Sequence, residues 1–487
     1  MTSKTPSPVA EESHSLHRSL THGQMTMIVL GSALGTGLFL GSGAAIKIAG
    51  PAVILSYAIG SLLAAVIGGV SGEMAVHSPV RGGFGAIAAK YLGPFAGFMT
   101  RWAYWTCTMV ITGIELVAVG SYLKFWWPQL PLWVGIAVFG AVIILLNVRS
   151  VRYFGAMEFA LSSVKVIALT AFILVGLCLI FFGLPSHAAT GVSNLTTDGG
   201  FMPHGFSSVW LSMAVVMFSF GGIEMISISA AEAKNPARSV RTAAKAMMWR
   251  LATFYVLAMF VVVAIIPWGR AAQLDGSVET SPFVEVFSQL GIPAIATITN
   301  VVVLVAALSA ANANLYAGTR LMHSLASDAM APTALAKVSS AGIPARAMWV
   351  STLGVVLAIA LAVFKPGSAF GMMMTLTMVS ALTVWVLILL AYMAFKRVEG
   401  NSSAFRLWGG RLTAAVGILV LLAIWAALFA AEGNAGPAIV GVVYFMVLTM
   451  VYFATVRKTH VPDDAIFAEA RQASSQGIES VDRNSRK

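Results

Sequence analysis

Long apolar windows separated by short polar segments dominate the chain. Twelve of them are long enough to cross the roughly 30 Å hydrocarbon core of a bilayer at about 1.5 Å per helical residue. They cover residues 24–48, 51–76, 96–123, 131–148, 155–183, 207–231, 248–268, 290–319, 347–364, 369–395, 412–431 and 437–456. The pattern predicts an all-α polytopic membrane protein, with one twelve-helix domain over 23–456 and polar tails at 1–22 and 457–487.

Composition supports this class. Hydrophobic residues make up 58 % of the chain and charged residues 10 %, against roughly 25 % charged residues in soluble domains. The net charge is +11, and the basic residues are dispersed among short loops. Because they form no recognisable nucleic-acid-binding motif, we expect no nucleic-acid partner. Cys107 and Cys178 both lie in apolar stretches and do not indicate a disulfide.

The placement of lysine and arginine predicts the orientation. If both termini are cytoplasmic, most basic loop residues fall on the cytoplasmic side, whereas the opposite loops contain only Lys47, Lys124, Arg270 and Lys365. The positive-inside rule therefore predicts cytoplasmic N and C termini.

Two glycine-interrupted segments, Leu34–Leu38 and Phe218–Gly222, lie in corresponding apolar windows. Windows one to five (24–183) and six to ten (207–395) can be superimposed as repeats, followed by helices eleven and twelve at 411–456. An odd number of spans inverts the second repeat, and broken helices then place a site near the midplane. Half-helix N-termini bind anions and unwound carbonyls bind cations, so a free amino acid is the natural ligand; close helix packing at small residues is the alternative.

Several motifs occur together in order. The set resembles the bacterial amino acid permeases of the amino acid-polyamine-organocation superfamily over about residues 18–456. The matching segments are Leu30–Gly43, Ala49–Pro51, Gly72–Met74, Trp102–Trp105, Met157–Phe159 with Lys165, Phe218–Glu224, Ala231–Pro236 and Ala307–Asn312.

This resemblance implies a leucine-transporter-like fold, a 5+5 inverted repeat with broken first and sixth helices, and proton-driven amino acid uptake across a bacterial inner membrane. It also implies where the substrate binds. Main-chain groups of Gly35, Thr36 and Gly37 are expected to bind the substrate carboxylate. The substrate amine and the gate are assigned to Phe218, Ser219, Phe220 and Gly221.

Ionisable residues inside apolar windows are the candidates for coupling transport to protons. Each costs at least about 2.5–3.5 kcal/mol near the bilayer centre unless it faces a cavity or a partner. The resemblance places Lys165 where proton-coupled relatives carry an amine that replaces a sodium ion. Glu158, two helical turns earlier, is its expected partner in proton coupling. A static ion pair between the two residues is the alternative to this coupling role. Glu115 and Asn312 are assigned to the side-chain pocket or to coupling, and Glu224 to a structural role at the second break.

Other functions fit less well. Gly69-Val70-Ser71-Gly72 matches a short pattern of intramembrane serine proteases, but no histidine lies within an apolar window to act as the base. A non-transporting sensor would not need Lys165. We therefore expect a secondary transporter of a small or medium neutral amino acid, with cationic amino acids next because of Glu115, and with protons and the lipid bilayer as its other partners. Exchange remains the alternative to symport, the sequence gives no oligomeric state, and no metal or other cofactor is expected.

Overall fold

The computed structural model describes residues 34–78, 83–149, 154–183, 188–229, 236–271, 281–289, 293–339, 343–400, 406–430 and 433–457. Within these ranges the regular secondary structure is helical. The first half contains α2 (Thr36–Phe39), α3 (Gly41–Ala49), α4 (Val53–His77), α5 (Gly83–Leu92), α6 (Pro94–Leu123), α7 (Leu132–Arg149) and α8 (Phe154–Phe181). The second half contains α9 (Gly205–Phe218), α10 (Met225–Ser229), α11 (Pro236–Ile265), α12 (Trp268–Ala271), α13 (Pro282–Gln289), α14 (Pro293–Ser327), α15 (Ala345–Ser351), α16 (Leu353–Phe364), α17 (Ala369–Val398), α18 (Gly410–Ala430) and α19 (Ala435–Val451).

Glycine and proline set several helix ends. Pro94 begins α6, where its missing N–H costs no hydrogen bond, and the preceding Gly93 has a φ of +98°. Gly50, with a φ of +61°, stands at the short turn between α3 and α4 and packs against Pro203. These two glycine–proline pairs divide neighbouring elements as the sequence indicates.

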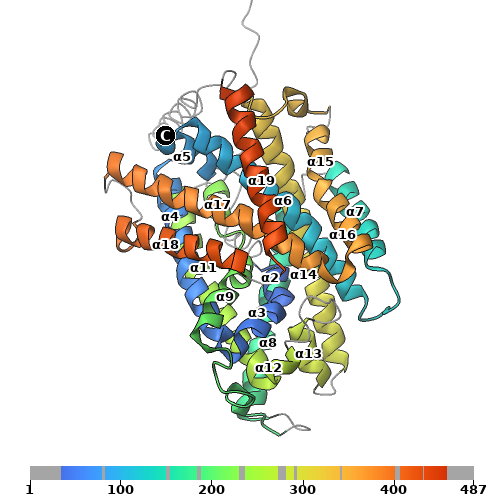
Figure 1. The fold of residues 1–487 in the computed structure, drawn as a ribbon. Coiled ribbons are helices and arrows are strands. Elements are labelled where there is room, and N and C mark those ends of the chain that lie inside the picture. The colour runs from blue at the N-terminus through green and yellow to red at the C-terminus, as the bar shows by residue number, and fades with distance from the viewer. Residues whose placement is uncertain are drawn as a thin grey trace, which may run out of the picture.

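The long helix α6 lies at the centre of the packing. It contacts α14, α17, α5, α16 and α7, and Figure 1 shows it running between the red α19 and the helices α14 and α16. A second group forms around α4, which packs against α11 and α9. The blue α3 lies beside the green α9 in the same view, so segments more than 150 residues apart meet near the middle of the fold.

Glycines allow the closest helix contacts. A Cβ at Gly113 of α6 would lie 2.3 Å from the carbonyl oxygen of Gly354, and one at Gly354 of α16 would lie 1.9 Å from the carbonyl oxygen of Met109. The two main chains therefore touch, a mode of packing typical of membrane helices with small residues at their interface.

The predicted membrane class is confirmed. Eight described helical runs are long and apolar enough to cross a bilayer, and three shorter apolar helices accompany them, at Leu132–Val148, Gly205–Phe218 and Ala252–Ile265. The exact number of twelve crossings and the 5+5 repeat remain predictions. The predicted N-terminal tail lies outside the described residues, as does the C-terminal tail after Arg457.

Polar side chains tie together the ends of α4, α5 and α17. Glu73 is fully buried and accepts hydrogen bonds from the Tyr392 hydroxyl (2.7 Å), the Lys396 ammonium (2.9 Å) and the Leu407 amide (2.8 Å). Nearby, the Tyr91 hydroxyl donates to Glu399 at 2.9 Å; this bond, together with His77 and Lys90, holds the pKa of the Glu399 carboxyl below its usual value. The cluster joins α4 to α17 and to the chain that leads into α18.

The close contact of α6 with α16 predicts a large difference between two glycine substitutions. Gly354→Ala places a methyl group against the main chain of α6 and should lower the free energy of unfolding by roughly 1–3 kcal/mol. Gly371→Ala on α17 is the matched control, because a Cβ there meets no atom within 4 Å. Thermal unfolding of both variants in detergent tests this; equal stability of the two variants would contradict the contact.

Candidate functional site

The second predicted helix break is present in the structure. Helix α9 ends at Phe218, Ser219–Glu224 form turns, and α10 begins at Met225. Gly222 has a φ of +95°, a backbone conformation that L side chains rarely adopt. Since helix ends leave main-chain groups without intrahelical partners, this break presents polar main-chain atoms inside an apolar fold.

The first break is described from Leu34 onward. Gly35 is extended (φ −117°, ψ −166°) and caps the single turn α2, and Leu40 separates α2 from α3. The first N–H groups of this turn belong to Thr36 and Gly37 and have no intrahelical acceptor. The part of the window before Leu34 lies outside the described residues.

The two breaks touch main chain to main chain. A Cβ at Gly37 would lie 2.7 Å from the Cα and 2.9 Å from the nitrogen of Ser219, and 3.0 Å from the carbonyl carbon of Phe218. Only glycine permits this approach. The contact brings the predicted carboxylate-binding and amine-binding segments together, although they are far apart in the sequence.

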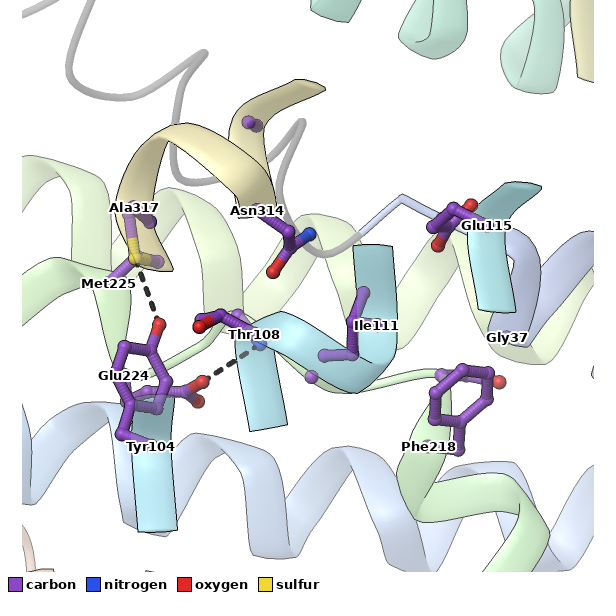
Figure 2. A pocket seen from close by; sticks show the side chains of 15 residues that line it. Gly37, Tyr104, Thr108, Ile111, Glu115, Phe218, Glu224, Met225, Asn314 and Ala317 are labelled. Atoms are coloured by element: carbon purple, nitrogen blue, oxygen red, sulfur yellow. Dashed lines mark hydrogen bonds between the residues drawn. The ribbon is translucent and has the colours of Figure 1, made fainter. Parts of the chain in front are cut away.

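Both breaks line one cavity of about 50 Å³. Figure 2 shows it as elongated, with Glu115, Gly37 and Phe218 at one end and Tyr104, Glu224 and Met225 at the other. The volume suffices for a few water molecules and is below the roughly 300–1,000 Å³ of drug-sized ligand sites. The surrounding residues are Gly35, Gly37, Tyr104, Thr108, Ile111, Glu115, Phe218, Ser219, Gly221, Gly222, Glu224, Met225, Ala313, Asn314 and Ala317.

Glu115 of α6 contacts the first break directly. One of its carboxyl oxygens, Oε1, accepts the Thr36 N–H at 3.3 Å and would lie 2.8 Å from a Cβ at Gly35. The side chain is 3 % exposed, and its second oxygen has no hydrogen-bond partner among the described residues. The Glu115 carboxyl group thus already accepts a hydrogen bond from an N–H at the start of α2.

Lys165 lies on α8 and is 1 % exposed. It is not among the residues that surround the cavity, but its charge acts on the Glu115 carboxyl. The side chain of Glu158, its predicted partner, lies outside the described part of the chain. Glu115 is thus one of the groups that the charge of Lys165 influences.

The two asparagines of α14 differ in their surroundings. Asn312, which we assigned to the pocket or to coupling, is not among the cavity residues and accepts a 2.7 Å hydrogen bond from Asn147 of α7. Asn314, two residues later, does line the cavity. Two positions along a helix rotate a side chain by about 200°, so the sequence run alone does not decide which asparagine faces inward.

Glu224 stabilises the second break. Its carboxyl group accepts the Gly222 N–H at 3.2 Å, drawn in Figure 2, and the indole N–H of Trp385 on α17 at 3.1 Å. Close by, the Tyr104 hydroxyl donates to the sulfur of Met225 at 3.0 Å. These contacts join Glu224 to the second break and to α17, and its structural role stays a prediction.

Several residues of the site carried no local signal in the sequence. Tyr57 and Tyr255 bond Ser219 from α4 and α11, and Thr108, Ile111 and Ala317 complete the cavity wall. Phe220 is fully buried against the two tyrosine rings and is not among the cavity residues.

Comparison with known proteins identifies the family. The family model described as "Amino acid permease" matches residues 24–462. The chain belongs to the amino acid permease family. Membership makes the permease an amino acid transporter and not an enzyme, so the serine pattern around Ser71 carries no protease function.

Individual relatives agree with this assignment. The permease is 44 % identical over 385 residues to the "Aromatic amino acid transport protein AroP" of Escherichia coli (strain K12), covering 79 % of the permease and 83 % of the relative. It is 42 % identical, with the same coverage, to the protein of that name from Salmonella typhi. It is 36 % identical over 450 residues to the "Uncharacterized amino acid permease YtnA" of Bacillus subtilis (strain 168), covering 91 % and 96 %.

The contact between the breaks predicts that Gly37 of the permease tolerates no larger residue. Gly37→Ala forces the main chains of α2 and α9 apart and should reduce amino acid uptake by at least about tenfold, the effect of losing roughly 1.4 kcal/mol of binding. Gly41→Ala, four residues later, is the control, because its nearest atoms lie at an ordinary 3.8 Å. Uptake should be measured in cells at matched expression; similar losses in both variants would contradict the special role of Gly37.

Proposed function

We propose that the permease imports an amino acid across the cytoplasmic membrane of a bacterium by proton symport, with alternating access to the cavity and with both termini in the cytoplasm. The observation that carries the proposal is the meeting of both helix breaks at one cavity. Such a cavity, lined by main chain from two interrupted helices, is typical of secondary transporters.

The two breaks offer complementary groups to a zwitterion. In the proposed arrangement the substrate carboxylate accepts the N–H groups of Thr36 and Gly37, where the helix dipole is positive. The ammonium group lies at the α9 break, beside the ring of Phe218, which contributes roughly 0.5–2 kcal/mol by cation–π attraction. Because Glu115 accepts the Thr36 N–H in this structure, the arriving substrate carboxylate displaces it.

Displacement of Glu115 connects substrate binding to Lys165. Both side chains are buried, and a charge on either one costs free energy in the membrane unless a partner compensates it. Movement of Glu115 away from the Thr36 N–H changes its electrostatic interaction with Lys165, and in the proposed mechanism this change couples substrate binding to the uptake or release of a proton. Lys165 thereby acts as the proton-coupling amine.

Aromatic amino acids are the first substrates to test. The permease covers most of two relatives that are named as aromatic amino acid transport proteins. Ala313 and Ala317 of α14 and Ile111 of α6 line the cavity and offer apolar surface for a side chain. A cavity of about 50 Å³ is too small for such a substrate, so its entry requires movement of the surrounding helices.

Uptake by purified protein in liposomes tests the function. Empty vesicles with an inward pH gradient should accumulate radiolabelled phenylalanine, tyrosine or tryptophan, and the gradient should be dissipated in proportion. Uptake that depends on internal amino acid instead would identify an exchanger. A panel in which no amino acid is transported or competes would contradict the whole proposal.

Lys165 provides the prediction for coupling. Lys165→Ala should abolish accumulation driven by the pH gradient while leaving counterflow, in which internal substrate drives entry of labelled substrate, within about threefold of wild type. Counterflow needs the binding site but no net movement of protons across the membrane. Undiminished accumulation by the variant would remove Lys165 from the coupling mechanism, and loss of both activities would show that it serves the fold.

A further inference from the structure

Two tyrosines hold Ser219 at the contact between the breaks. The hydroxyl of Tyr255 on α11 donates to the carbonyl oxygen of Ser219 at 2.7 Å. The hydroxyl of Tyr57 on α4 lies 3.0 Å from the Ser219 hydroxyl. Both tyrosines are fully buried, so these contacts are protected from water.

The Ser219 carbonyl needs such a donor because of its position. Ser219 is the C-cap of α9, and the last carbonyl groups of a helix have no intrahelical N–H partner. A carbonyl oxygen at this point would otherwise be available to a cation in the cavity. Tyr255 donates to it in this structure, so the Ser219 carbonyl, which we assigned to the substrate amine, already has one hydrogen-bond partner.

Further main chain lines the cavity two residues later. Gly221 lines it, and since glycine has no side chain, it does so through main-chain atoms. The carbonyl of Gly222 already accepts the Met225 N–H at 3.1 Å, and its own N–H is donated to Glu224. Gly221 follows directly from the segment that Tyr255 fixes. A shift of Ser219 therefore moves the groups that surround the amine.

The ring of Tyr255 is held independently of its hydroxyl. Its centroid lies 4.7 Å from that of Phe220 and 6.0 Å, edge to face, from that of Tyr57. Aromatic pairs in this range contribute packing energy of their own. Removing the hydroxyl alone thus deletes the bond to Ser219 and leaves the ring in place.

We propose that Tyr255 is a positioning residue for amine recognition: its hydroxyl fixes the Ser219 carbonyl so that the main chain at Gly221 receives the substrate ammonium. The inference rests on the proposed function and adds the means by which the site distinguishes an amino acid from a simple carboxylic acid. Tyr57 bonds the serine side chain and not the main chain, so it supplies a matched comparison within the same cluster.

The experiment compares competition by L-phenylalanine with competition by 3-phenylpropionate, which lacks only the amino group. Their inhibition constants against uptake of labelled substrate give a discrimination ratio. Tyr255→Phe should lower this ratio by on the order of tenfold, the effect of a weakened hydrogen bond to a charged group, with a raised KM and little change in maximal rate. Tyr57→Phe should lower the ratio less than Tyr255→Phe does, because it removes a contact to the Ser219 side chain and keeps the hydrogen bond to the Ser219 carbonyl.

The outcomes separate the possible failures. An unchanged ratio in Tyr255→Phe, or equal weakening of both inhibitors, overturns the positioning role. Should this variant fail to fold, Phe220→Leu, which keeps the Tyr255 hydroxyl and loosens its ring, should lower the ratio partially; no change there also overturns the proposal.

Wild-type protein that transports other amino acids but is not inhibited by phenylalanine overturns the choice of aromatic substrate, and the ratio is then measured with the transported amino acid and its deaminated analogue. Wild-type protein that no amino acid inhibits overturns the proposed function itself.

Discussion

The site depends on one constraint: unpaired main-chain groups inside a bilayer must find partners within the protein. Each of the two interrupted helices leaves main-chain groups without intrahelical partners. The two breaks lie together because Gly37 allows the start of α2 to touch the end of α9. Glu115 then takes the N–H of Thr36, Tyr255 takes the carbonyl of Ser219, and Glu224 takes the N–H of Gly222. Each partner comes from a side chain that is almost completely buried.

These partners do more than satisfy hydrogen bonds. Glu115 holds an N–H that a substrate carboxylate requires, so binding and displacement become one event in the proposed mechanism. Tyr255 donates to the Ser219 carbonyl and, in the proposed arrangement, positions the main chain at Gly221 for the amine. The different roles of Glu115 and Tyr255 follow from the donors and acceptors that they bond. They depend on the fold, which brings α4, α6 and α11 to the same place.

Much of the architecture could be predicted from the sequence. Apolar length and glycine–proline pairs predicted the helices, and the matched glycine segments predicted that Gly35, Gly37, Phe218, Ser219 and Gly221 lie at one site. The choice between Asn312 and Asn314 could not be predicted, because it depends on the rotation of α14 against α6 and α7. The roles of Tyr57, Tyr255 and Trp385 depend on contacts between distant helices, for which one sequence contains no signal.

The central claim is that an amino acid binds with its carboxylate at the N–H groups of α2, in place of Glu115. Solid-state NMR of the protein in lipid, with a carboxyl-¹³C aromatic amino acid and ¹⁵N-labelled threonine and glycine, measures this directly. The account predicts dipolar coupling between the substrate carboxyl carbon and the amide nitrogens of Thr36 and Gly37, as expected across a hydrogen bond, together with a changed environment for the Glu115 carboxyl. Saturable binding without such coupling, or with Glu115 still bonded to Thr36, would contradict it.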